Sequence, residues 1–107
     1  MIIDSLKRKL IEYQKSQNEV GLSTTRLLIS ELKYKEIALK GEGKEISPED
    51  ELRVLRKQIK NRMESIPMYE KANRLETAEK EKQEVKILED LIKEFFPNEP
   101  ITNPNTR

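Results

Sequence analysis

Residues 54 to 65 read Val54-Leu55-Arg56-Lys57-Gln58-Ile59-Lys60-Asn61-Arg62-Met63-Glu64-Ser65, and they place an apolar row beside a basic row on what we expect to be one helix. At about 100° per residue, each row falls within one arc of the helix surface. The apolar row consists of Leu52, Leu55, Ile59, Met63 and Ile66, and the basic row of Arg53, Arg56, Lys57 and Lys60. There is no acidic residue between Arg53 and Met63. One face of this helix should therefore pack against other helices, while the neighbouring face presents positive charge.

The composition restricts the classes of function that are open to the chain. Its 107 residues carry 21 basic and 20 acidic side chains, a net charge of +1, so binding to nucleic acid would have to come from a local patch. Cysteine and histidine are absent, which excludes disulfides, thiolate nucleophiles, Cys/His zinc sites and imidazole catalysis. We therefore expect no metal and no cofactor. Because the N-terminus has no apolar run suited to a signal peptide or a membrane span, we expect a cytoplasmic protein with no membrane role.

The first half of the chain predicts two helices. Ile3, Leu6, Leu10 and Tyr13 recur at helical spacing up to about Lys15, and a break follows over residues 16–22. Ser23, Thr24 or Thr25 can cap the second helix, which should run to about Lys40 and end at the glycines of residues 41–44. The apolar face expected for it consists of Leu28, Ile29, Leu32, Ile37 and Leu39.

The second half predicts two more. Ser47-Pro48-Glu49-Asp50 is a helix start, with a capping hydroxyl, proline at the first helical position and acids in the first turn. Pro67 should kink this long helix or end it near Ile66, and a kink is favoured. Asn73 tolerates the left-handed conformation and marks the turn into a fourth helix, from about Leu75 to Phe96.

These elements predict an all-α fold: a single four-helix domain over residues 1–97, with a long third helix. Residues 98–107 hold two further prolines and little apolar content, so we expect a flexible, disordered C-terminal tail.

Four groups of short strings follow one another over residues 22–97 with nearly ungapped spacing. They are Arg26-Leu27-Leu28 through Lys33 with Glu36-Ile37, Ser47-Pro48-Glu49-Asp50-Glu51 with residues 54–62, Glu64-Ser65-Ile66 with Tyr69-Glu70-Lys71-Ala72 and Arg74, and Ala78-Glu79-Lys80-Glu81-Lys82 through Ile87-Leu88-Glu89. Together these strings resemble the GatB/YqeY family, which comprises YqeY-like proteins and the tail domain of the B subunit of tRNA-dependent amidotransferases. The resemblance implies an association with tRNA and with carbon–nitrogen ligase complexes.

The chain departs from the family pattern at three places. Asn73 stands where the family tends to have glycine, and Pro67 where a helix former is usual. The family usually continues into a second, smaller helical subdomain, whereas Phe95-Phe96-Pro97 is followed here by polar residues. The resemblance therefore covers the N-terminal subdomain only.

A nucleic-acid site is the main functional hypothesis. Arg53, Arg56, Lys57 and Lys60, with Arg62 on the other flank of the apolar row, could contact phosphates of a structured RNA, for which donors spaced along a face suffice. The alternative is a solvated helix flank whose cations pair with acids on a neighbouring helix, such as Glu31, Glu36 or Glu84. No aromatic residue lies in the basic row, so base stacking is not supported, and Tyr13, Tyr34 and Tyr69 are interpreted as residues at the edge of the core.

The predicted function is that of a non-catalytic accessory module, associated with tRNA or with a tRNA-processing enzyme. The rival hypothesis is a protein–protein adaptor, with a protein partner or self-association near Phe95 and Phe96. No residue set supports an autonomous carbon–nitrogen ligase, because the serines and threonines lack an activating histidine.

Overall fold

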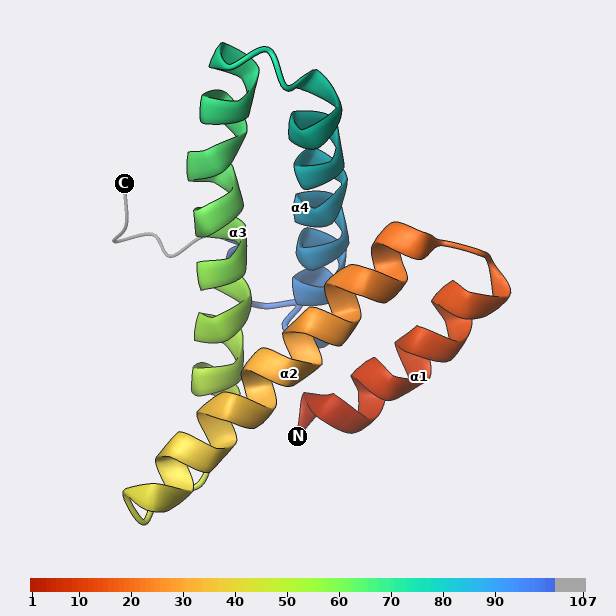
Figure 1. Cartoon of the computed structure of the whole chain (residues 1–107). Coiled ribbons are helices and arrows are strands. Elements are labelled where there is room, and N and C mark those ends of the chain that lie inside the picture. The colour runs from red at the N-terminus through yellow and green to blue at the C-terminus, as the bar shows by residue number, and fades with distance from the viewer. Residues whose placement is uncertain (102–107) are drawn as a thin grey trace. The chain divides into compact units, whose positions relative to one another are not determined.

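The computed structural model describes residues 1–101. Within them the chain forms four helices and no strand (Figure 1). The helices are α1 (Ile2–Lys15), α2 (Glu19–Gly41), α3 (Pro48–Lys71) and α4 (Leu75–Phe95). The predicted all-α fold, its four helices and its long third helix are thereby confirmed.

Contacts divide the chain into two compact units, residues 1–54 and the residues from 55 onward. The first unit contains α1, α2 and residues 48–54 of α3, and the second contains the remainder of α3 and α4. The predicted division into a domain of residues 1–97 and a tail of 98–107 stays a prediction, and 102–107 lie outside the described residues.

In the first unit, α1 packs against α2, and the turn between them differs from the prediction. The second helix begins at Glu19 because the side chain of Asn18 accepts the N–H of Gly21 at 2.9 Å, so Asn18 is the cap. Thr24 and Thr25 are buried one turn inside the helix. A Cβ at Gly21 would lie 2.6 Å from Cδ1 of Tyr13, so glycine allows the two helices to approach closely here.

The buried face of α2 also differs from the prediction at one position. Leu28, Leu32 and Leu39 are buried as expected, but Ile37 is 68% exposed. Five residues after Leu32, Ile37 has turned by about 140° around the helix, and it therefore points away from the core. Tyr34, interpreted as a core-edge residue, is likewise 77% exposed.

The start of α3 matches the prediction. The N–H and hydroxyl of Ser47 donate to Oδ2 of Asp50 at 3.0 Å and 2.9 Å, and the N–H of Asp50 donates back to the Ser47 hydroxyl at 3.2 Å. These bonds from Ser47, together with the charges of Arg53 and Lys35, hold the pKa of the Asp50 carboxyl below its usual value. Next to it, the buried Glu51 accepts the N–H of Ile2 at 2.9 Å and so ties the start of α1 to the start of α3.

In the second unit, α3 and α4 lie side by side as a helical hairpin (Figure 1). Its turn contains Asn73 at φ 57°, as predicted, and α3 continues through Pro67 to Lys71 and does not end near Ile66. Met63 does not belong to the buried row, because its side chain is exposed, whereas Leu55, Ile59 and Ile66 are buried. A hydrogen bond from the Ser65 hydroxyl on α3 to Oε2 of Glu81 on α4, 2.6 Å long, also joins the two helices.

Among the described residues, no helix is both long enough and apolar enough to cross a lipid bilayer.

Candidate nucleic-acid interface

Lys57 and Lys60 are the two lysines of the basic row, and both are exposed. They lie on α3 three residues apart, about one helical turn, so both side chains leave the same side of the helix. Within residues 1–101 neither has a hydrogen bond or an ion pair. We call them the α3 lysine pair. Their ammonium groups can meet an anion without first breaking a contact to any of the described residues.

Arg56, on the same side of α3, is already occupied. Its Nε and Nη2 groups donate to the carbonyl oxygen of Pro100 at 3.2 Å and 2.7 Å, and Nη2 lies 3.5 Å from Oε2 of Glu99. Only 18% of the side chain is exposed. Residues 99 and 100 belong to the segment predicted as a tail, and they contact α3 here. Binding of an anion by Arg56 would have to displace or bridge this segment.

Arg53 belongs to the first unit and is exposed, with 69% of its side chain accessible. Its Nη1 lies 3.3 Å from Oδ1 of Asp50, one turn earlier on the helix. An exposed pair of this kind contributes only a few tenths of a kcal/mol, so it holds Arg53 weakly.

Arg62 is in a different environment from the other cations. Its side chain is only 11% exposed, and its Nε lies 3.5 Å from Oε1 of Glu84 on α4. Its Nη1 donates to the carbonyl oxygen of Gln58 at 3.2 Å and to Oε1 of the same residue at 2.5 Å. This is the arrangement described by the alternative hypothesis, a cation paired with an acid on the neighbouring helix. Arg62 joins α3 to α4 and has little surface left for a ligand.

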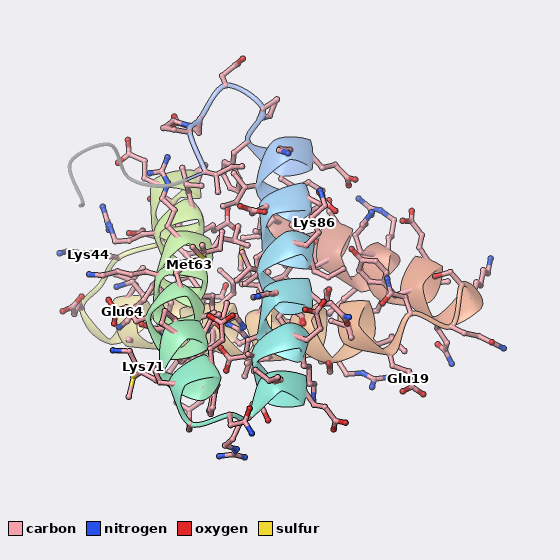
Figure 2. All side chains as sticks on the ribbon, turned by 90° about the horizontal axis from the view of Figure 1, so that it is seen from above. Glu19, Lys44, Met63, Glu64, Lys71 and Lys86 are labelled. Carbon is pink, nitrogen blue, oxygen red and sulfur yellow. The ribbon has the colours of Figure 1, made fainter. Side chains whose placement is uncertain are left out.

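The rest of the exposed side of α3 is of mixed character. Glu64 and Lys71 project from the side of α3 that faces away from α4 (Figure 2). Between Arg53 and Glu64 the exposed positions are basic or neutral, and the first carboxylate appears at Glu64, one turn after Lys60. The basic surface is therefore short, about two helical turns, which suits contact with a few phosphates and not a long nucleic-acid track.

The described residues contain no group of three or more acidic side chains placed to hold a metal ion. Glu81 is hydrogen-bonded to Ser65, and Glu84 is paired with Arg62. These carboxylates hold the helical hairpin together.

Two features of this surface had no clear signal in the sequence. The contact of Glu99 and Pro100 with Arg56 joins positions 43 and 44 residues apart, and nothing in the local pattern indicates it. The burial of Arg62 could have been suspected from its place on the flank of the apolar row, seven residues after Leu55.

The four helices and the strings quoted above are those expected of a YqeY-like protein, and comparison with known proteins agrees. Residues 3–103 match the family model described as Yqey-like protein, and the chain belongs to this family. It is also similar to a protein of Schizosaccharomyces pombe (strain 972), described as uncharacterized protein C22F3.15. The two are 34% identical over 93 residues, which cover 87% of this chain and 73% of the relative. The family predicted from the sequence is confirmed, and the match begins earlier and ends later than residues 22–97.

Proposed function

We propose that this protein is a non-catalytic helical module that binds structured RNA, of the tRNA class, through phosphate contacts made by the α3 lysine pair. The observation that carries the proposal is that Lys57 and Lys60 are exposed on one side of α3 and unpaired within residues 1–101, while a neighbouring cation, Arg62, is paired and buried. The likeness of the YqeY-like family to amidotransferase tail domains supports RNA as the anion.

Arg56 has a conditional place in this proposal. Its two bonds to the Pro100 carbonyl are bonds to a neutral acceptor, and its ion pair at 3.5 Å is with Glu99, which is 53% exposed, so a phosphate has to replace both contacts. We include Arg56 as a contact that forms when the segment at residues 99–100 moves aside. Arg53 is not needed by the proposal, and Arg62 is left out of the contact surface because Glu84 already neutralises it.

The electrostatics predict modest and salt-sensitive binding. With a net charge of +1, the whole protein attracts RNA little, so the local cations must supply the affinity. Each phosphate that a lysine neutralises releases counterions, and the dependence of log affinity on log salt concentration steepens by about 0.7 to 0.9 per contact.

The test is a salt titration of the binding of unfractionated tRNA to the full chain and to the double variant Lys57→Ala, Lys60→Ala. We expect the variant to bind several-fold more weakly and its salt slope to fall by about 1.5. The matched control is Lys80→Ala, Lys93→Ala, which removes two exposed lysines from α4. Equal affinities and slopes for the three proteins, or no binding at 50 mM salt, would disprove the proposal.

The adaptor hypothesis had placed a partner near Phe95 and Phe96. Both side chains are half-buried at the end of α4, so part of each ring is accessible and the adaptor hypothesis stays a prediction. Within residues 1–101, three of the exposed large apolar side chains lie together on α2, namely Leu27, Tyr34 and Ile37, and the others are spread over the remaining helices and the N-terminus.

A further inference from the structure

We propose that the outward side of α2 is a docking surface for an amphipathic helix of another protein, one that carries a row of carboxylates along one edge. This surface consists of Leu27, Tyr34 and Ile37, bordered by a row of cations, Arg26, Lys33 and Lys40. We call the first set the α2 apolar face and the second the α2 basic row. The proposal does not depend on RNA binding by α3.

The α2 apolar face is a continuous strip and not a scatter of exposed residues. Leu27, Tyr34 and Ile37 fall within about 80° of the helix surface, opposite the buried Leu28, Leu32 and Leu39. The other positions of the strip are small: Ser30 lies between Leu27 and Tyr34, Ala38 and Gly41 follow Ile37, and all three are exposed. Small residues beside large ones form the holes and knobs that a second helix can interlock with.

The α2 basic row selects the chemistry of the partner. Arg26, Lys33 and Lys40 recur at an interval of seven residues, about 10.5 Å along the helix, and stay within about 40° of one another. All three are exposed, and none has a hydrogen bond or an ion pair within the part of the chain that the structure describes. A partner helix with Asp or Glu at every seventh residue would pair with all of them, in the way that edge charges pair across coiled coils.

A second copy of this chain would neutralise the charges of the α2 basic row less well. In a parallel pair of α2 helices Arg26 would face Glu31 of the other copy, but Lys33 would face Ala38. In an antiparallel pair the basic row would face its own counterpart, and the like charges would repel. Charge complementarity therefore favours a different protein over self-association.

A lipid surface also fits less well. The edge opposite the basic row carries Glu31 and Glu42, both exposed, and an anionic membrane would repel them. A helical partner with a single acidic edge avoids these two carboxylates because it covers only the apolar face and one border.

The test places the photo-crosslinker p-benzoylphenylalanine at Tyr34 of the full chain, in cells that make the protein naturally, and identifies the crosslinked segment by mass spectrometry. We expect a segment of another protein with helical apolar spacing and acids seven residues apart. The same crosslinker at Lys71, exposed on α3, is the control for position and should not give this product. A product with a second copy, an RNA or a lipid, the same product from Lys71, or no product at all would overturn the proposal.

Charge reversal provides the second arm. Arg26→Glu, Lys33→Glu, Lys40→Glu should lower the yield of the Tyr34 product about tenfold. Lys71→Glu, Lys80→Glu, Lys93→Glu makes the same change in net charge at exposed positions elsewhere and should leave the yield unchanged. Circular dichroism of both variants checks that helicity is retained. An equal loss in both triple variants would show that overall charge and not the α2 basic row is responsible, and would contradict the proposal.

Discussion

The exposed sides of α2 and α3 carry similar cations in different surroundings. On α3, Lys57 and Lys60 lie beside polar positions, and the one large apolar side chain exposed between Arg56 and Glu64 is Met63. On α2, the basic row borders three large exposed apolar side chains. Phosphate contact needs only spaced donors, whereas exposed apolar surface gains free energy when another apolar surface covers it. The neighbours of a cation, more than the cation itself, indicate which kind of ligand it serves.

The largest effects on the free energy of unfolding should come from substitutions on the buried side of α2. Substitutions on its exposed side should have little effect. Leu32→Ala leaves a cavity where a leucine with no exposed surface stood, and the free energy of unfolding should fall by about 2–5 kcal/mol. Tyr34→Ser, two residues later on the exposed side, should change it by less than about 0.5 kcal/mol. Urea unfolding followed by circular dichroism measures both. A Tyr34→Ser variant as unstable as Leu32→Ala would mean that the α2 apolar face is part of the core, and the contrast between the two helices would disappear.

A smaller effect should separate the buried cation of α3 from the exposed ones. Arg62→Ala leaves the half-buried Glu84 without its partner, and the free energy of unfolding should fall by about 1–3 kcal/mol. We set this below the cost of breaking a fully buried pair, because both side chains keep some contact with water. Lys57→Ala and Lys60→Ala should be neutral within about 0.5 kcal/mol in the same urea experiment. Equal destabilisation by the three substitutions would show that the α3 lysine pair also has a structural role.

The caps of α2 and α3 should differ in their response to acid. Because the pKa of Asp50 is lowered in the folded protein, its carboxylate stabilises the fold above its unfolded pKa, and this contribution is lost as the pH falls through the folded pKa. The difference in stability between wild type and Asp50→Asn should therefore shrink below about pH 4. The cap of α2 is Asn18, which does not titrate, so the difference caused by Asn18→Ala should stay constant through the same series. Thermal unfolding between pH 7 and pH 3 tests both, and parallel curves for the two caps would refute the assignment.

The same regions show which features of the fold can be predicted from the sequence. Elements that depend on local chemistry were predictable: Ser47 with Asp50 starts α3, Asn73 makes the turn before α4, and the glycines after Lys40 end α2. Asn18 was missed as a cap because Gly21 suggested a break, although glycine serves there to admit the ring of Tyr13.

The sequence predicted which segments are helical better than it predicted which side of each helix is buried. Ile37 comes five residues after Leu32, an interval that turns it about 140° around α2, and Met63 lies about 80° from Leu55 at the edge of the apolar row, so both side chains are exposed. The local sequence pattern could not predict which residues pair with the cations of α3. The pairing of Arg62 with Glu84 was one of several possibilities, and the contact of Arg56 with Pro100 depends on the path of the chain after α4.

The smallest expected effect is also the sharpest test of the contrast between the two helices. If α2 serves a protein and α3 serves RNA, Arg26→Glu, Lys33→Glu, Lys40→Glu should reduce tRNA affinity only through the change in net charge, which screening at 150 mM salt limits to about twofold. Lys57→Ala, Lys60→Ala should leave the yield of the Tyr34 crosslink within the same factor. Both measurements use the full chain and the assays already described. A loss of tRNA affinity in the α2 variant as large as in the α3 variant would contradict the assignment of RNA to the α3 lysine pair alone, because two independent sites cannot respond equally to charges on different helices.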